Sequence, residues 1–431
     1  MSAALLARLK DEYGAVRDAL PAAVIGGERR REAIEALCAQ GLPATREENW
    51  RYANLRVLER ARFSPVASRA GIADLPAPLA GFARLVFVDG VLAAGAPVDR
   101  TGLVIHSLCS GAPLGAACEP QPIAALPETR LALLNEGFAT DGAAIRVRRE
   151  AGTPHIELLF IASSPAQAGS SYPRVQLSLE AGARLTLVER HVSAGDEASL
   201  INCAVRADLA AGARLDHYRL QQTSARAAWF DTLEATLAQD ARYSVLAVSA
   251  GALAARSTVH IRLTGAAAEV ALSAAGIGNR QQSQDTYALS EHMAPRTRTE
   301  QIFRGIASGR ARVAFSGKIA VRENARGTDS RQSLRGLLAG PEAEIDVRPQ
   351  LEIYTDEVRC SHGATAGKLD ENMFFYLLSR GLAPEVAQRL LKWAFLEDVV
   401  SRIELPEVRQ RIEHELAGQM SDLAPLKELL R

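Results

Sequence analysis

The sequence has few cysteines, and they are scattered without a Cys-x-x-Cys pair. The five cysteines in 431 residues are Cys38, Cys109, Cys118, Cys203 and Cys360. An odd and dispersed set does not suit a disulfide framework or a self-contained zinc site. We therefore expect most of these thiols to be small buried apolar side chains.

Long apolar runs and an excess of one charge are also missing. No window approaches the ~18–20 apolar residues of a membrane helix, and Lys10 to Glu12 interrupt the start of the chain, which argues against a signal peptide. Fifty basic residues balance fifty acidic ones, so nothing attracts the chain generally to nucleic acid or to an anionic membrane. No phosphate-binding glycine loop is found. We expect a cytoplasmic protein that binds no nucleic acid, membrane or nucleotide itself.

Apolar residues make up 48% of the chain, and their spacing changes along it. Helical spacing predicts an N-terminal helical region over 1–80, in which Thr45 and Glu48 fit a capping box. Short alternating segments predict a strand-rich region over 81–366, with regular coils from about residue 143. Helical spacing returns over 367–431, where Asp370, Pro384 and Pro406 stand at expected helix starts.

An internal repeat runs through the strand-rich region. Segments such as "LEAGARLTLVER" and "LAAGARLDHYRL" share a tight turn, an alanine and an alternating strand. They align on Ala183, Ala213, Ala241, Ala268, Ala311 and Ala343, with steps of 30, 28, 27, 43 and 32 residues. A step near 30 favours a strand solenoid, in which stacked coils share one core. The 43-residue step predicts an excursion or a change of face, and a β-sandwich remains the alternative.

The stretch "VRCSHGATAG" (358–367) places Cys360 and His362 two residues apart on a predicted strand. Such residues share a face with backbones ~6–7 Å apart, whereas a thiol–imidazole dyad needs ~3 Å. A dyad is therefore disfavoured. The pair suits partial ligation of a metal site whose other ligands come from elsewhere, and plain packing also stays open.

A second class of function is a carbohydrate-active enzyme, because strand solenoids also host polysaccharide cleavage. That chemistry needs clustered carboxylates on one outer face. The candidates are Asp346, Glu352, Asp356 and Glu357, which are scattered without an obvious partner.

The segment "RPQLEIYTDEVRCSHGATAGKLDENMFFYLLSRGL" (348–382) resembles the SufB/SufD family of iron–sulfur cluster assembly proteins. Further similarity lies in "SGKIAVRENARGTDSRQSLRGLL", "EHMAPRTRTEQIFRGI" and "TREENWRYANL". The resemblance implies a mostly β fold, with a parallel, right-handed β-helix core flanked by N- and C-terminal helical regions. It also implies a non-catalytic subunit of a SufB–SufC–SufD complex, in which SufC is the ATPase.

Two departures separate this chain from SufB-like members of the family. Those members carry a cysteine in the stretch matching "GTDSRQSLRG", where this chain has Gln332 and Ser333. They also place glutamates on both sides of the histidine, where this chain has Ser361 and Gly363. Both departures resemble SufD-like members, and the alternative is a SufB-like cluster scaffold.

The resemblance also implies residue roles. His362, with Cys360 as a weaker neighbour, would contact a transient iron–sulfur cluster shared with a SufB-like subunit joined through the β-helix. The C-terminal helices would dock the SufC-like ATPase, with partner-binding candidates Glu371, Asn372, Pro384 and Lys392. Core packing there is expected of Phe374, Phe375 and Trp393, and the isolated chain is expected to be capable of forming a homodimer.

Overall fold

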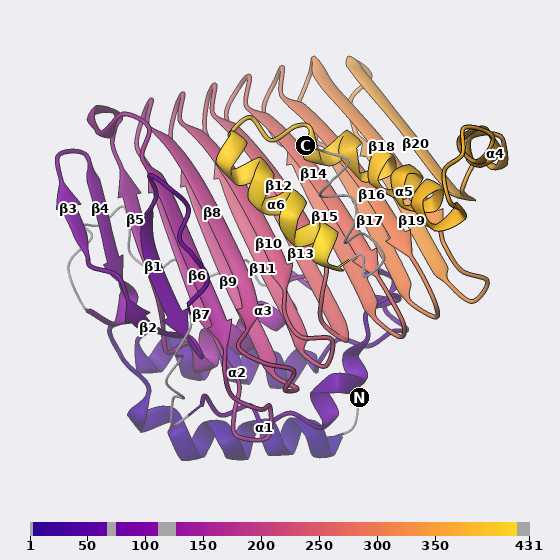
Figure 1. Ribbon diagram of the computed structural model, residues 1–431. Coiled ribbons are helices and arrows are strands. Elements are labelled where there is room, and N and C mark those ends of the chain that lie inside the picture. Colours follow the sequence, from indigo (N-terminus) through magenta and orange to yellow (C-terminus); the bar gives the residue numbers. More distant parts are fainter. Residues whose placement is uncertain (1–2, 67–74, 111–125, 420–431) are drawn as a thin grey trace.

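The centre of the molecule is a stack of parallel strands in two sheets that enclose one core (Figure 1). The computed structural model describes residues 3–66, 75–110 and 126–419, and Cys118 lies outside them. In this part of the chain each sheet has ten strands.

Sheet 1 contains, in spatial order, β2 (Val91–Ala94), β1 (Ala83–Val88), β6 (His155–Ala162), β8 (Arg184–Ser193), β10 (Arg214–Gln222), β12 (Arg242–Ser249), β14 (Glu269–Gly278), β16 (Arg298–Ala307), β18 (Thr328–Leu338) and β20 (Val358–Lys368). Sheet 2 contains β3 (Val98–Arg100), β4 (Leu103–Ser107), β5 (Asp141–Val147), β7 (Pro173–Leu179), β9 (Leu200–Leu209), β11 (Ala228–Leu237), β13 (Ala254–Leu263), β15 (Ser283–His292), β17 (Arg312–Val321) and β19 (Glu344–Ile353).

From β5 onwards, successive strands alternate between the two sheets, so each coil of the chain gives one strand to each. Strand β10 pairs in parallel with β8 on one side and β12 on the other, without a break in register. Sandwich hairpins would instead pair neighbouring strands antiparallel. The predicted solenoid is therefore confirmed, and the β-sandwich alternative is wrong.

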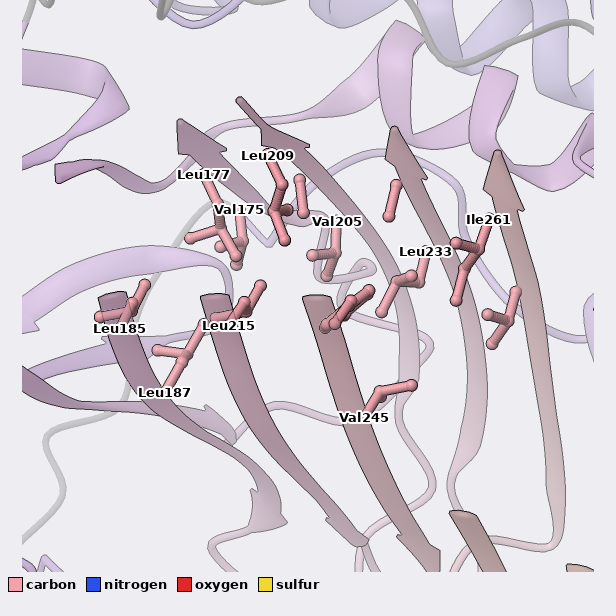
Figure 2. Close-up of a cluster of buried hydrophobic side chains, with 14 of the residues drawn as sticks. Val175, Leu177, Leu185, Leu187, Val205, Leu209, Leu215, Leu233, Val245 and Ile261 are labelled. Carbon is pink, nitrogen blue, oxygen red and sulfur yellow. The ribbon is translucent and has the colours of Figure 1, made fainter. Parts of the chain in front are cut away.

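Alternate side chains of both sheets fill the space between them. Figure 2 shows Leu185, Leu215 and Val245 from sheet 1 opposite residues of sheet 2 such as Val205 and Leu233. Because side chains alternate along a strand, every second residue enters this lumen and shares it with the coils above and below. One coil alone could not bury that apolar face, so stacking is what makes the coils stable.

The aligned alanines stand at a corner where the coils approach closely. The N–H of Arg214 donates to the carbonyl oxygen of Ala183 (2.8 Å), and Arg242 N–H does the same to Ala213 (2.8 Å). These alanines are fully covered. A small side chain suits this corner, as the repeat predicts.

The long 43-residue step is a change of face. In the next coil, Thr297 occupies the position that is equivalent to Ala268 at the corner of sheet 1. The N–H of the following residue, Arg298, donates to the Ala268 carbonyl oxygen (3.0 Å). Ala311 stands instead at a corner of sheet 2, where Glu344 N–H donates to its carbonyl oxygen (2.9 Å). Threonine in place of alanine hid one coil from the sequence pattern.

Helices lie against both outer faces of the solenoid (Figure 1). The N-terminal helices α1 (Ala3–Val16) and α2 (Gly27–Gln40) pack with α3 (Arg130–Phe138), which contacts β9 and β11 of sheet 2. The C-terminal helices are α4 (Glu371–Ser379), α5 (Pro384–Val400) and α6 (Pro406–Gln419), and α5 crosses β14 and β16 of sheet 1. Within the described ranges, no helix is long and apolar enough to cross a membrane.

Several local predictions can be compared with the structure. Asp370 caps α4 by accepting from the N–H groups of Asn372 and Met373, as expected, and Pro384 begins α5. The Thr45–Glu48 capping box is wrong: a short 3-10 helix begins at Glu48, and the Glu47 carboxylate accepts from Ala44 N–H (2.9 Å) instead. The neighbouring Glu47 competes successfully for the turn because its side chain reaches back to a free N–H.

The cysteine side chains are less buried than the sequence predicts. Cys203 is buried, Cys38 and Cys360 are half-buried, and Cys109 is exposed, so the expectation of mostly buried thiols is wrong. All four described cysteines are free, which agrees with the absence of a disulfide pattern.

The outer face of sheet 2 carries a pH-sensitive ion pair, His260–Glu291 (2.8 Å), beside Arg322. The hydrogen bond from His260 outweighs burial and lowers the pKa of Glu291 to about 2. Burial lowers the pKa of His260, but the neighbouring carboxylates of Glu234 and Glu291 outweigh it and raise that pKa. The contribution of Glu291 to the free energy of unfolding is therefore fully present above pH ~4.5 and is lost as pH falls. The contribution of His260 is fully present below pH ~6.5 and is lost as pH rises.

We expect Glu291→Gln to lower the free energy of unfolding by about 1 kcal/mol at pH 5.5, after allowance for solvent screening. The difference from the unsubstituted chain should shrink towards zero as pH approaches 2. Urea denaturation at several pH values measures both. Glu342→Gln, which removes an exposed pair 4.0 Å from Arg310, is the control and should show little pH dependence. A constant difference from pH 2 to pH 7 would contradict the prediction.

Candidate functional site

The two ends of the solenoid are finished differently. At the beginning, the short antiparallel strands β2 and β3 form the edges of the sheets. At the other end, the edges are β20 and β19, which are long and have a pairing partner on one side. Short edge strands protect a sheet from further pairing, whereas long free edges are open to it. We call the end formed by β19 and β20 the open end.

Lumen side chains of the last coil are uncovered at the open end. In β19 they pair in register with interior residues of β17: Ile345 lies beside Val313, and Ile353 beside Val321. Val313 and Val321 are fully buried, whereas Ile353 is 41% exposed because no further coil covers it. The last coil thus exposes to solvent apolar side chains that a further coil would bury.

Cys360 and His362 lie on β20 and face the lumen of this last coil. Cys360 pairs with Ser330 and His362 with Gln332, both nearly inaccessible interior residues of β18. Cys360 also packs against a small buried cluster that includes Ile319 and is half-buried, while His362 is exposed. The strand therefore brings the two predicted ligands to one face, at the mouth of the solenoid.

A polar row lies directly beneath the pair. Gln301 Nε2 donates to Ser290 Oγ (3.1 Å), and Gln332 Nε2 donates to Gln301 Oε1 (2.9 Å). Gly317 on the opposite sheet leaves room for these amides, because a Cβ there would lie 2.6 Å from Gln301 Oε1. Ser330 Oγ and Gln332 Oε1 are buried and have no hydrogen-bond partner in the part of the chain that the structure describes.

The donor set at the open end is incomplete for an iron–sulfur cluster within the part of the chain that the structure describes. Thiolate and imidazole suit iron, but a cluster needs about four ligands. Among the described residues, no group of three or more His, Cys, Asp or Glu side chains is placed to hold a metal ion. Cys360 and His362 fit as two donors of a larger set, and the other donors of such a site would lie outside the described part of this chain.

The predicted partner-binding residues are only partly brought together. Glu371 and Lys392 line one groove of about 360 Å³ between the end of β18 and helices α4 and α5, together with Phe374. Asn372 and Pro384 lie at the first turns of α4 and α5 and do not line it.

Helix α4 exposes more apolar surface than the sequence predicts. Trp393 is buried as expected, but Phe375 is 71% exposed, so its assignment to the core is wrong. Met373 and Tyr376 are exposed beside it. The helix spacing is right, but α4 stands at the end of the solenoid, where there is no core for this face to enter (Figure 1).

Three of the four carboxylates proposed for a carbohydrate-active site lie beside separate basic residues. Asp346 pairs with Arg312 (3.0 Å) and Glu352 with Lys318 (2.7 Å). Glu357 lies 3.9 Å from Arg326. Asp346, Glu352 and Glu357 each face a different basic residue, so these three carboxylates do not form the acid–base pair that glycoside hydrolysis needs.

Sequence reasoning missed a buried charged network in the lumen several coils away. Arg219 lies between the carboxylates of Glu189 (2.7 Å) and Asp231 (2.7 Å). His191 (2.6 Å) and His217 (3.1 Å) also contact Glu189. Burial alone would raise the pKa of Glu189, but Arg219 and the two histidines hold it well below its usual range. The repeat alignment contained the signal, since it stacks Arg219 directly on Glu189.

Comparison with known proteins gives consistent matches to one family. Residues 160–395, more than half of the chain, match the family model of the SufBD core domain of the SUF system for iron–sulfur cluster assembly. The chain is 29% identical to the iron–sulfur cluster assembly protein SufD of Escherichia coli, over 88% of this chain and 89% of that protein. It is 27% identical to a SufBD family protein of Synechocystis, over 89% of each chain. The chain therefore belongs to the SufBD family of proteins for iron–sulfur cluster assembly.

Proposed function

We propose that this chain is a SufD-like, non-enzymatic subunit that joins a SufB-like subunit through the open end of its solenoid. The observation that carries the proposal is the uncovered last coil, where β19 and β20 have free edges and lumen residues such as Ile353 are exposed. Main-chain hydrogen bonds to a free strand edge, combined with apolar pockets, are a common basis of recognition. A second strand solenoid is the partner whose last coil has the matching shape.

In such a complex Cys360 and His362 would stand at the junction between the two lumens. A nascent iron–sulfur cluster, the cargo of the system, would be bound by these two donors and by donors from the SufB-like subunit. Ser361 and Gly363 supply no further donor beside them. The shortage of ligands among the described residues is what a shared site requires.

Helices α4 and α5 would dock a SufC-like ATPase. Met373, Phe375 and Tyr376 form an exposed apolar face on α4, beside the groove lined by Glu371 and Lys392. Apolar surface of this kind is buried at the centre of many protein interfaces. ATP binding by the partner would shift the population of junction conformations, because α4 follows β20 after Leu369 and Asp370. The cytoplasmic location and the homodimer of the isolated chain stay predictions.

The interface is tested by charge placed on either side of β20. Ala364 pairs with the buried Leu334 and so lies on the lumen side, whereas Thr365 lies on the other face of the same strand. We expect Ala364→Arg to abolish co-purification with a SufB-like subunit, because an unpaired charge would enter the junction. Thr365→Arg is the matched control and should leave the complex intact. Equal binding by both variants would disprove an interface at the open end.

The role of His362 is tested in the assembled complex. His362→Ala is expected to lower the yield of reconstituted cluster at least tenfold, because one of about four ligands is lost. Iron and sulfide analysis with visible absorption measures the yield. His414→Ala, which removes an exposed histidine on α6, should have no effect. A normal yield with His362→Ala would remove this residue from the site.

A further inference from the structure

The glutamine row beneath His362 has a direction. Each amide Nε2 donates towards the interior of the stack: Gln332 to Gln301, and Gln301 to Ser290. The free end of the row is therefore an acceptor, Oε1 of Gln332, which is buried and has no partner among the described residues. A buried carbonyl without a hydrogen bond costs free energy, so its place in the fold calls for an explanation.

The next side chain along the row is His362. Gln332 and His362 are direct neighbours on the paired strands β18 and β20, and such strands lie about 4.8 Å apart. Gln332 is almost inaccessible, whereas the His362 ring is exposed in the absence of a covering coil. A partner that covers the open end would hold the His362 ring against the Gln332 side chain.

We propose that Oε1 of Gln332 accepts a hydrogen bond from one ring nitrogen of His362 and thereby turns the other ring nitrogen towards the metal. This inference rests on the proposed ligand role of His362. A metal-binding histidine commonly donates its second ring N–H to a carbonyl or carboxylate, which fixes the ring and its tautomer. Gln332 is thus a positioning residue, and the row to Ser290 holds its amide in place.

The neighbouring residues Gln301 and Gly317 favour this orientation of the Gln332 amide. If the amide were reversed, its NH2 group would face His362 and its oxygen would face Gln301 Oε1, so the observed hydrogen bond (2.9 Å) would be lost. Gly317 admits the two amides by its lack of a side chain. The orientation of the Gln332 amide is therefore tied to the orientations of Gln301 and Ser290.

The test uses the complex with SufB-like and SufC-like partners, and Co²⁺ as the probe. Gln332→Met, which keeps the side-chain length but removes the acceptor, is expected to weaken Co²⁺ binding 10- to 100-fold. Gln332→Glu keeps an acceptor oxygen for His362. If the Gln301 amide turns, its NH2 group donates to the new carboxylate and Ser290 Oγ donates to its oxygen, so this variant should bind Co²⁺ at least as tightly as the unsubstituted complex. Gln221→Met, at another buried lumen glutamine, is the matched control and should bind normally.

A spectroscopic signal separates positioning from packing. The paramagnetically shifted N–H proton of Co²⁺-bound His362 should be protected from exchange in the unsubstituted and Gln332→Glu complexes, and lost in Gln332→Met. Equal weakening by Gln332→Met and Gln332→Glu, or retention of the N–H signal in Gln332→Met, would overturn the proposal. If His362→Ala leaves Co²⁺ affinity unchanged, the ligand role itself fails; if it abolishes binding while Gln332→Met does not, only the role of Gln332 fails.

Discussion

Replacing Arg219 by methionine is expected to destabilise the folded chain by about 3–5 kcal/mol, the usual result of removing one partner from a buried ion network. Arg219 is 5% exposed and hydrogen-bonds Glu189 and Asp231, which have almost no contact with solvent. Burial lowers the pKa of Arg219, but the two carboxylates outweigh it and raise that pKa well above its usual value. Without the guanidinium, the buried carboxylate of Asp231 would lose its counter-charge, and Glu189 would keep only its contacts with His191 and His217.

Urea denaturation followed by circular dichroism measures this effect. Arg242→Met on the neighbouring strand removes an exposed arginine 3.3 Å from Glu269, and should cost less than about 1 kcal/mol. The triple change Glu189→Gln, Arg219→Met, Asp231→Asn should recover much of the loss, because no charge is then left unpaired. A loss with Arg219→Met as small as that of Arg242→Met would show that the network does not hold the lumen together.

Replacing Trp50 by alanine is expected to cost about 3–5 kcal/mol. The Trp50 ring is 1% exposed and lies 4.4 Å from the guanidinium of Arg256, which the Asp285 carboxylate neutralises from below. The indole N–H donates to the carbonyl oxygen of Pro127 (3.1 Å). One side chain therefore joins the N-terminal segment to β13 and to the connection before α3, and its loss would leave a cavity over a buried cation.

The same substitution should also loosen the open end. Glu48 and Asn49, next to Trp50, hydrogen-bond Arg348 of β19 (2.7 Å and 2.9 Å). Hydrogen exchange of β19 is expected to rise in Trp50→Ala and to stay low in Trp50→Phe, which keeps a ring against Arg256. Tyr354→Ala, at an exposed aromatic residue, is the control for stability. Unchanged unfolding free energy in Trp50→Ala would disprove the anchoring role of Trp50.

Local sequence signals predicted most helix and corner positions correctly. Asp370 and Pro384 begin helices because capping and the fixed proline φ act within a few residues. Ala183 and Ala213 identified the coil because each corner repeats the same close approach of backbones. Thr297 broke the pattern, since a corner tolerates any small residue, and the alignment slipped from one sheet to the other.

At the candidate site, too, local spacing predicted one feature correctly, and long-range pairing decided the others. The spacing of Cys360 and His362 determined that they share a face, because side chains alternate along any strand. Which face that is, and that it opens at an uncovered end, depends on pairing with β18 across many intervening residues. The exposure of Phe375 and the pairing of Asp346 with Arg312 likewise depend on which coil comes last.

By itself, the sequence determined a repeating strand, a capped helical tail and a cysteine–histidine pair on one face, because these follow from the φ/ψ preferences and alternation of neighbouring residues. The tertiary structure decided which residues are neighbours: Arg219 contacts Glu189, Trp50 contacts Arg256, and Gln332 lies opposite His362 on paired strands. Each of these contacts joins different coils or segments, and the register between coils is set by the shared core rather than by any one stretch of chain.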